Sequence, residues 1–353
     1  MLNLQNSIAF LERHDYPGFT TNGGTIVYCN THAQAIGMEE GGDVTSMLGD
    51  FWSQVQEMGD GALFVALDVH GGLVHAEISR TTEGYLFLLE IPGDDLCLRS
   101  LALTSAQLRP PLNSMLTSLE TLLSEHEYSP PILQEMCQGY YQMRQILDNM
   151  SDAYMFHTEP MLWKESTELG NALEEIFETA ATMTESTGHT ITFHAPIRKT
   201  IALVDREQLE MCILRLLSNS LRFLPPNGHI HGELLSNKSH AIVRITDNGE
   251  GIPQEVFSSL FARFHRIPGL EDSRYGLGLG LTNIRGFATA HGGAVYVAPA
   301  SGGGTEVSVS IALRKKFQNA VNSPIPKPMS SGILEKARIE LVRALPRSCY
   351  DHV

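Results

Sequence analysis

The chain has 353 residues, of which 42% are hydrophobic and 18% charged, and its formal net charge is -15. This is the composition of a soluble globular protein with room for two or three domains. The negative charge argues against a general binder of nucleic acid or anionic membranes, because an acidic surface repels both. The five cysteines are far apart and lack metal-ligand spacing, which favours free thiols in a reducing compartment.

No stretch of the sequence predicts a membrane anchor or a secretion signal. No apolar run approaches the ~20 residues that a membrane-spanning helix needs. The first residues, MLNLQNSIAFLERHD, lack the basic region and apolar core of a signal peptide. We therefore expect a cytoplasmic protein without a membrane span.

Residues 1–92 predict a small α+β unit. It contains four β-rich runs bounded by glycines, GGTIVYCN, GALFVALDV, GLVHAEISR and GYLFLLEI. The second and third runs meet at His70-Gly71-Gly72, a junction typical of a hairpin. Short helical patterns fill the stretch between the first two runs.

Residues 93–158 predict two long amphipathic helices. Leucines recur at near-helical spacing over 96–122, Ser129-Pro130-Pro131 breaks the pattern, and a second apolar run covers 132–150. Two such helices joined by a short loop form a hairpin. Because a lone hairpin cannot bury both faces, we expect two copies to form a dimeric four-helix bundle. The alternative is a hairpin packed on its own chain's domains.

Residues 159–314 have a mixed α/β pattern that becomes rich in glycine toward the end. Residues 315–353 begin with a linker-like stretch containing SPIPKP and SSG. A short amphipathic helix, GILEKARIELVRAL, follows, and Pro346 ends it. Docking of this helix on a domain, docking on a partner and a frayed tail are all open from the sequence.

The motifs that carry chemistry lie within residues 209–305. A predicted strand ends at Asp247, whose carboxylate can accept a hydrogen bond from a purine amino group. Gly249 and Gly251 lack a Cβ, so the backbone there can lie close to a flat ring. Taken alone, this D-x-G-x-G pattern fits a strand-to-turn junction with an Asp cap better.

A second glycine motif follows about 25 residues later, after a segment long enough to act as a lid. Gly276, Gly278 and Gly280 alternate with leucines, and such a loop at the start of a helix exposes N–H groups to phosphate oxygens. The alternative is a flexible loop entering a buried helix. The segment between the two motifs carries Arg263 and Arg266.

Asn219 lies in the apolar run MCILRLLSNSLRF, which predicts a buried helix. Its carboxamide offers a neutral oxygen to a hard cation such as Mg²⁺. Arg222, three residues later and close to the same face, can reach a phosphate. For an isolated asparagine, a capping or packing amide within the helix is the simpler interpretation.

The order of these motifs changes the interpretation, because together they resemble the ATP-binding domain of the sensor histidine kinases. The stretches that match that family's N, first glycine, F, second glycine and third glycine boxes are, in turn, Asn219, 247–251, 261–266, 276–281 and Gly304-Thr305. The resemblance implies an α/β sandwich shared with Hsp90-type chaperones, gyrase and mismatch-repair ATPases.

The upstream segments extend the resemblance. Residues 1–92 resemble a PAS sensor domain, and residues 93–158 resemble the family's dimerisation and phosphoacceptor hairpin. The implied fold class is multidomain α+β, with a PAS-like α/β sensor, a two-helix hairpin, an ATPase-type α/β sandwich over 159–314, and a linker with a C-terminal helix.

The resemblance also implies a role for each matched residue. Asp247 would bind adenine, Asn219 would hold Mg²⁺, and Arg222 takes the place of a lysine that contacts phosphate. The other implied nucleotide contacts are the glycines of the two boxes, with Gly276, Gly278 and Gly280 at the lid hinge and the phosphates, Arg263 and Arg266 at the triphosphate, and Thr305.

One residue departs from the family's ATP-binding pattern. Relatives usually have a second asparagine one helical turn before the Mg²⁺-binding one, and this chain has Arg215 there. The guanidinium either replaces part of a cation's charge at the site or faces solvent.

The phosphoacceptor motif departs further. Family members carry an acceptor histidine, an acidic residue and then L-R-x-P-L, whereas this chain reads Ala106-Gln107-Leu108-Arg109-Pro110-Pro111-Leu112. The acceptor position is therefore Ala106, which has no nucleophile for the γ-phosphate. The position of the neighbouring base is Gln107, which cannot ionise. Pro111 is the family's hinge, a kink that frees a backbone carbonyl, and Pro110 doubles it.

Other side chains near the motif are not obvious acceptors. His126 and His157 are poorly placed along the hairpin. Thr104, Ser105 and Ser114 are interpreted as ordinary helix-surface hydroxyls.

The sequence thus predicts a PAS-linked protein of the sensor histidine kinase family that binds Mg·ATP but lacks its own acceptor. Its output would be conformational, read by a response-regulator-like protein or a kinase, in a homodimer or a heterodimer with another histidine kinase. Two alternatives stay open: an active kinase that phosphorylates a partner's histidine in trans, and a plain ATP-binding module of the Hsp90 superfamily.

Overall fold

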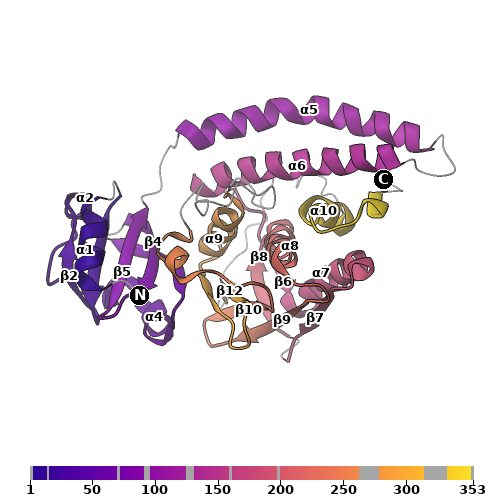
Figure 1. Cartoon of the computed structure of the whole chain (residues 1–353). Helices are drawn as coiled ribbons and strands as arrows, with labels where there is room; N and C mark the ends of the chain where they lie inside the picture. Colours follow the sequence, from indigo (N-terminus) through magenta and orange to yellow (C-terminus); the bar gives the residue numbers. More distant parts are fainter. Residues whose placement is uncertain are drawn as a thin grey trace.

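The computed structural model describes residues 3–13, 16–69, 72–90, 96–124, 131–158, 161–196, 199–261, 278–313 and 332–350. Figure 1 shows a first α/β unit at one side, a long helical hairpin across the top, and a second α/β unit beneath the hairpin. None of the helices in these segments has the length and apolar character that a bilayer crossing requires.

The first unit is built on five antiparallel strands. They are β1 (Gly18–Asn22), β2 (Thr25–Cys29), β3 (Ala62–Val69), β4 (Gly72–Arg80) and β5 (Tyr85–Glu90), in the spatial order β2-β1-β5-β4-β3. The helical elements are α1 (Leu4–Glu12), α2 (Thr31–Ala35), α3 (Thr45–Leu48), the 3₁₀ turn η1 (Gly49–Phe51) and α4 (Trp52–Glu57).

The four predicted β-rich runs of this unit form β2 to β5. Strands β3 and β4 pair as far as Val69 and Gly72, and the predicted turn residues 70 and 71 lie outside the described residues. The sequence pattern does not reveal α1 or β1, whose residues GFTTN include a single large apolar side chain. That side chain, Phe19, stacks on Phe87 of β5 with ring centroids 4.5 Å apart, so packing and not propensity places β1 in the sheet.

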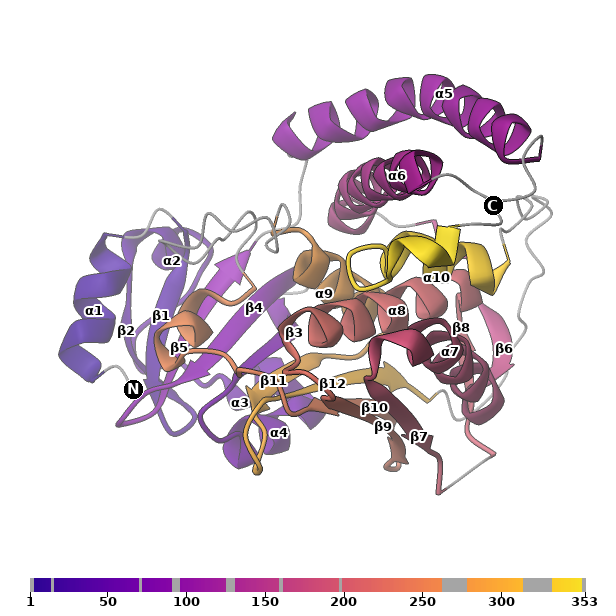
Figure 2. The ribbon, with the colours of Figure 1, turned by 45° about the vertical axis from the view of Figure 1, so that its right-hand side comes forward.

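Two long helices, α5 (Leu96–Ser124) and α6 (Pro131–His157), form the predicted hairpin. They lie antiparallel, and α6 lies between α5 and the second unit (Figures 1 and 2). Pro110 and Pro111 stay inside α5, where each frees the carbonyl four residues earlier. The hairpin does pack on its own chain through α6, while its assembly into a four-helix bundle stays a prediction.

The second unit, residues 161–313, is a two-layer α/β sandwich. Its main strands are β7 (Thr190–His194), β9 (His229–Ser236), β10 (His240–Asp247), β11 (Val295–Pro299) and β12 (Thr305–Ala312), in the order β11-β12-β10-β9-β7. Strand β7 is parallel to β9, and the other neighbours are antiparallel. Helices α7 (Leu169–Thr184), α8 (Arg206–Phe223) and α9 (Gly280–Ala290) cover one face of this sheet (Figure 2).

Smaller elements complete the second unit. A separate two-stranded sheet pairs β6 (Glu165–Glu168) with β8 (Ile201–Val204). Short 3₁₀ turns are η2 (Glu185–Thr187) and η3 (Gln254–Ser259). The core between helices and sheet is apolar, with Leu217 of α8 and Ile284 of α9 fully buried; this burial is the main favourable contribution to the unit's stability.

One continuous sheet joins the first and second units. Strand β3 pairs antiparallel with β11, so all ten strands run β2-β1-β5-β4-β3-β11-β12-β10-β9-β7. Gly61 allows this contact, because an added Cβ would lie 2.4 Å from the carbonyl oxygen of Val297. The predicted units therefore share one sheet, although the hairpin separates them in sequence.

Helices α6 and α9 approach closely at Gly286, where an added Cβ would lie 2.4 Å from the Cβ of Phe156. We expect Gly286→Ala to lower the free energy of unfolding by about 1–3 kcal/mol, because a packed interface cannot absorb the methyl group without shifting. Gly139 of α6 is the matched control, since nothing lies within 4 Å of its added Cβ. Gly139→Ala should raise the free energy of unfolding by about 0.5–1 kcal/mol. Denaturant titrations measure both, and effects of equal sign would contradict the close packing.

The tail segment, residues 332–350, docks on its own chain. It comprises α10 (Ile333–Glu340) and the 3₁₀ turn η4 (Arg347–Tyr350), and it lies between α6 and the helices α7 and α8 (Figures 1 and 2). Three alternatives were open from the sequence, and in the structure the helix docks on a domain of its own chain. Residues 314–331, which include the predicted linker, lie outside the described residues.

Candidate functional site

Asp247, at the end of β10, is held by three hydrogen bonds. Its Oδ1 accepts from the backbone N–H groups of Gly249 (3.0 Å) and Thr305 (3.1 Å), and its Oδ2 accepts from the Ser220 hydroxyl (2.9 Å). A carboxylate has about four acceptor positions, so one remains on Oδ2 when donors from the described residues are counted. This geometry fits the predicted contact with a purine amino group.

Sequence reasoning missed Ser220, which α8 directs toward the end of β10. The residue is 7% exposed and directly follows Asn219, so its position on a buried helix face was the available signal. Its hydroxyl fixes the second carboxylate oxygen of Asp247, which a turn cap alone would not need.

Glycines let the backbone pass close to Asp247. At Gly304 an added Cβ would lie 2.1 Å from the Asp247 carbonyl oxygen, and φ is +90°. Gly251 has φ of +76°, and its added Cβ would lie 3.4 Å from the Gly304 carbonyl oxygen. Both positive φ values favour glycine. The first and third glycine boxes therefore meet at one place.

Asn219 on α8 faces the start of α9. An added Cβ on Gly280 would lie 3.9 Å from Asn219 Nδ2, so the N box and the second glycine box are neighbours. Gly278 has φ of +73°, and α9 begins two residues later. A helix N-terminus offers N–H groups to phosphate oxygens. Arg222, half-buried in the last turn of α8, lies one turn beyond Asn219.

A metal at this site would depend on the nucleotide. Within the described segments, no group of three or more His, Cys, Asp or Glu side chains is arranged to hold a metal ion. Mg²⁺ in nucleotide sites takes most of its ligands from phosphates and water and few from protein. One amide oxygen from Asn219 fits that requirement.

Three predicted site residues, Arg263, Arg266 and Gly276, lie outside the described residues. The described part of the F box ends at Phe261, which is 1% exposed. Its N–H donates to Oε1 of Glu77 on β4 (3.2 Å), and its ring centroid lies 5.4 Å from that of Phe64 on β3. The first unit therefore contacts the start of the F box directly.

Charged groups gather where the first unit, the hairpin and α9 meet. Burial raises the pKa of Glu77 to about 7, although the Phe261 N–H and the Arg285 guanidinium oppose this shift. Burial also lowers the pKa of Arg285 to about 10, and Arg285 pairs with Glu90 at 2.6 Å. His157, at the end of α6, has its Nδ1 3.5 Å from Glu90 Oε1. The end of the hairpin thus lies toward the first unit, as an antiparallel pair requires.

Arg215 requires a correction, because the solvent-facing alternative is wrong. The side chain is 4% exposed, and it pairs with Asp152 of α6 (2.6 Å) and Glu340 of α10 (3.0 Å). Neither partner belongs to the predicted nucleotide residues. Burial disfavours the charge on Arg215, but Glu340 and Asp152 outweigh it and raise its pKa. Residue 215 therefore links three helices.

The acceptor-equivalent position is exposed, since Ala106 and Gln107 both face solvent on α5. Ser105 is fully buried instead, so its interpretation as a surface hydroxyl is wrong. Its Oγ donates to the Leu147 carbonyl (2.8 Å) and lies 2.9 Å from the Ser151 hydroxyl. These contacts join α5 to α6. Because Ser105 is buried in them, it is excluded as a substitute acceptor.

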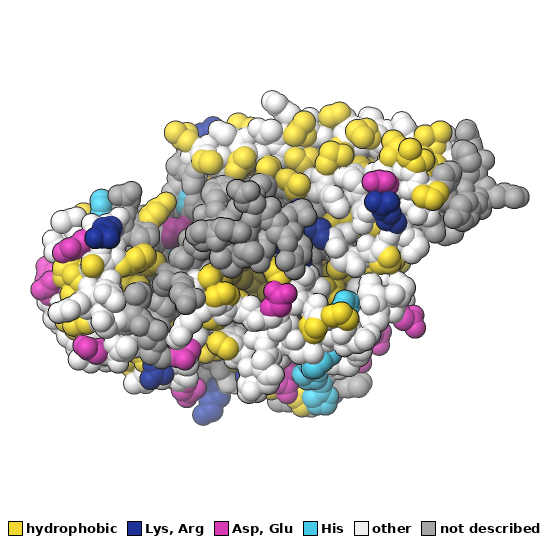
Figure 3. All heavy atoms as spheres, viewed as in Figure 1, with side chains coloured by type: hydrophobic (Ala, Val, Ile, Leu, Met, Phe, Trp, Pro, Cys, Tyr) yellow, Lys and Arg dark blue, Asp and Glu magenta, His cyan; other side chains and the backbone are white. Residues whose placement is uncertain are grey.

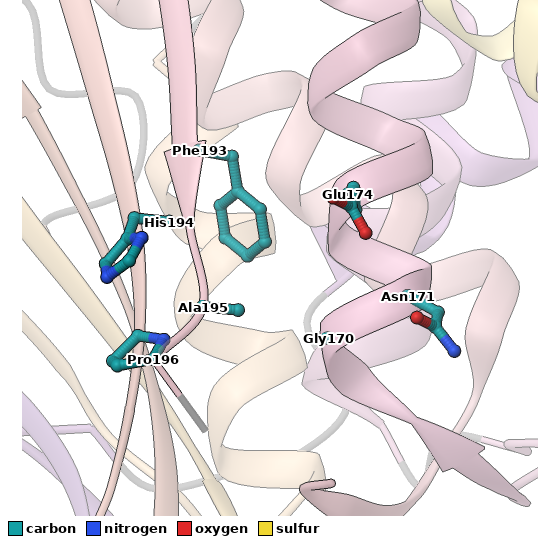
Figure 4. A pocket seen from close by; sticks show the side chains of 7 residues that line it. All are labelled: Gly170, Asn171, Glu174, Phe193, His194, Ala195 and Pro196. Carbon is teal, nitrogen blue, oxygen red and sulfur yellow. The ribbon is translucent and has the colours of Figure 1, made fainter. Parts of the chain in front are cut away.

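A cavity of about 320 Å³ opens between α7 and β7. Figure 4 shows the side chains that line it: Gly170, Asn171, Glu174, Phe193, His194, Ala195 and Pro196. None of the predicted nucleotide contacts is among them. The cavity therefore adds no residue to the candidate site.

Most of the second unit matches a known family of ATPase domains. Residues 204–315 match the family described as histidine kinase-, DNA gyrase B-, and HSP90-like ATPase. A stretch of 115 residues is 40% identical to the sensor histidine kinase TmoS of Ectopseudomonas mendocina, over 32% of this chain and 12% of that protein. A stretch of 229 residues is 24% identical to the sensor histidine kinase WalK of Bacillus subtilis, over 61% of this chain and 36% of that protein.

A solved structure is similar in fold. Full-length ShkA in complex with AMPPNP superimposes with a TM-score of 0.50 at 19% identity, over 60% of this chain and 45% of that one. The chain spans a minor part of the length of each of these relatives.

Proposed function

Because the chain belongs to the sensor histidine kinase family and carries that family's type of ATPase domain, we propose that it binds Mg·ATP without having a phosphoacceptor of its own. The observation that carries nucleotide binding is Asp247. Within the part of the chain that the structure describes, its Oδ1 is saturated by two backbone N–H groups while its Oδ2 keeps one open acceptor position.

The phosphate side of the proposed site rests on the meeting of α8 and α9. Asn219 and Gly280 are close neighbours there, and the N-terminus of α9 supplies N–H donors for phosphate oxygens. Asn219 would hold Mg²⁺ and Arg222 would contact phosphate. The solved relative bound to AMPPNP, a non-hydrolysable ATP analogue, supports this proposal by its shared fold.

The proposal that the chain has no phosphoacceptor rests on Ala106, which lies on the exposed face of α5. Phosphoryl transfer to protein needs a nucleophile in line with the γ-phosphate, and Ala106 provides none. Gln107 cannot serve as a base. The chain would then act through its conformation, with ATP and the state of the first unit both affecting the hairpin.

We assign the first unit, residues 1–92, to a PAS-like sensor. The support is its strand order, β2-β1-β5-β4-β3, with helices α2 to α4 inserted between β2 and β3. Residues 93–158 would be the dimerisation hairpin, 159–314 the ATPase domain, and 315–353 the linker and tail.

Dimerisation is supported by an exposed apolar face on the hairpin. Figure 3 shows hydrophobic side chains along its outer surface, and five large ones on α5 are 42–73% exposed: Leu96, Leu103, Leu108, Met115 and Leu122. A four-helix bundle would cover them. A partner of the same family could instead supply the second hairpin, with its own histidine, and a response-regulator-like protein would read the result.

Calorimetric titration with ATP tests the proposal. With Mg²⁺ present we expect one nucleotide per chain, and chelating the Mg²⁺ should weaken binding because Asn219 alone cannot replace the bridging cation. Absence of any binding at millimolar ATP would rule out both the acceptor-less sensor and the kinase acting in trans. Label on the histidine of an added partner chain would favour the kinase in trans.

A further inference from the structure

We propose that the tail segment, residues 332–350, is a releasable strap that holds the ATPase domain against α6. Its docked state bridges α8 and α6, and its release loosens the attachment of the domain to the hairpin. The inference does not depend on nucleotide binding, since it rests on contacts among the tail segment, α6 and α8.

Apolar burial holds the tail segment against α6, α7 and α8. Six of its apolar side chains are at most 3% exposed, and all join the same core as α6, α7 and α8: Ala337, Ile339, Leu341, Val342, Leu345 and Tyr350. The Tyr350 ring lies 5.3 Å from that of Tyr141 on α6. The segment thus fills a gap between hairpin and domain that neither closes alone.

Polar contacts attach the tail segment to α6 along several turns. Gln145 donates to the Glu340 carbonyl (2.8 Å), and the Tyr141 hydroxyl donates to Glu335 (3.0 Å). Gln138 donates to the carbonyls of Val342 and Leu345, at 3.3 Å each. Val342 and Leu345 lie beyond the end of α10 at Glu340, so their carbonyls take no part in the hydrogen bonds of that helix.

Buried ion pairs attach the same segment to α8. Glu340, which is 1% exposed, pairs with Arg215 at 3.0 Å, and Lys336, 3% exposed, pairs with Glu210 at 2.7 Å. A buried charge is tolerated only while its partner is present. Both pairs break when the segment leaves, but Glu210 keeps Arg206 within α8, and Arg215 keeps Asp152 as long as α6 stays beside α8. Loss of the segment alone therefore leaves neither of these charges on α8 without a partner.

A segment whose departure leaves the charges on α8 paired differs from an ordinary core element. The charges left behind on α8 are not orphaned, and the segment follows the stretch predicted as a linker, residues 319–332. Arg215, at the position where relatives have a second asparagine, thus binds the strap through Glu340. Release would leave α6 and α8 joined by the Arg215–Asp152 pair, while the α6–α9 contact at Gly286 persists.

Hydrogen exchange measured by mass spectrometry on the full chain tests this. In the wild type we expect peptides of α10 to exchange about 100-fold faster than those of α8, because a strap opens as its own unit. Glu340→Lys, which places a second cation against Arg215, should deprotect α10 and the facing turns of α6 while α8 stays protected. Arg347→Glu is the matched control, since its partner Glu135 is 62% exposed and such rim pairs contribute little.

A milder variant distinguishes release of the tail segment from unfolding of the whole chain. Lys336→Met removes one anchor, leaves Glu210 paired with Arg206, and should speed exchange in α10 by a smaller factor. Exchange of α10 and α8 together, as one unit in the wild type, would refute the strap. So would loss of protection across α8 in either anchor variant, since the segment would then be part of the domain's core.

Discussion

Replacing Asp247 with asparagine is expected to weaken ATP binding by about 10- to 100-fold while leaving the fold intact. The Oδ1 position must remain an oxygen, because it accepts from the N–H groups of Gly249 and Thr305. The new amide nitrogen therefore takes the Oδ2 position, where the Ser220 hydroxyl can turn and accept from it. There it would face a purine amino group donor to donor, so the base contact is lost and the protein contacts survive.

Calorimetry with ATP and with GTP measures this effect. The amide nitrogen can donate to the O6 oxygen of guanine, so the preference for ATP over GTP should fall in Asp247→Asn. Asp50→Asn, in the exposed η1 turn of the first unit, is the control and should leave both affinities unchanged. If Asp247→Asn binds ATP as tightly as the wild type, the carboxylate is a turn cap and not an adenine ligand.

The double variant Ala106→His with Gln107→Glu is expected to gain autophosphorylation that the wild type lacks. The imidazole nitrogen attacks the γ-phosphorus, the bond to the β–γ bridging oxygen breaks, and ADP leaves. The new carboxylate accepts the hydrogen bond from the other ring nitrogen and orients the imidazole. Position 106 is exposed on α5, so the larger side chain fits without repacking.

The label should be acid-labile and base-stable, as phosphohistidine is. Ser118→His combined with Gln107→Glu is the matched control, because it places a histidine on an exposed part of α5 about 18 Å further along the helix. It should take no label. Because α6 lies between α5 and α8 (Figure 2), transfer within one chain needs the domain to move, so adding Glu340→Lys should increase the label. A double variant that binds ATP and takes no label would show that the ATPase domain has lost phosphoryl transfer.

Local motifs were predictable from the sequence where chemistry demands particular residues at short spacing. Gly249 and Gly251 fall within a few positions of Asp247, and backbone proximity requires both to be glycine. The hairpin was predictable for a similar reason, since an apolar period near 3.6 that lasts for more than 20 residues is typical of a helix and not of a strand or a loop.

Ser105 could have been placed correctly from the same pattern. It lies seven residues after Leu98 and seven before Leu112, and Leu119 continues the series. All four are at most 5% exposed, so the buried stripe of α5 follows a seven-residue repeat in which one member is a serine. Its polar side chain favoured the surface, whereas its position in the repeat determined that it is buried.

Long-range pairings were beyond the reach of sequence reasoning. The contact of β3 with β11 joins segments more than 220 residues apart through backbone groups, and a strand edge has the same sequence pattern whether it is free or paired. Arg215 is similar, because its partners Asp152 and Glu340 come from helices on either side of it in sequence. No local feature near residue 215 signals a buried triad.

The most direct test of an ATP-binding protein without an acceptor uses the wild-type chain, Mg²⁺ and γ-labelled ATP. Bound nucleotide and protein-bound phosphate are counted separately after equilibration. We predict bound nucleotide and no acid-labile, base-stable phosphate on the chain. Such phosphate on this chain alone would contradict the account, because an acceptor other than position 106 would then be at work.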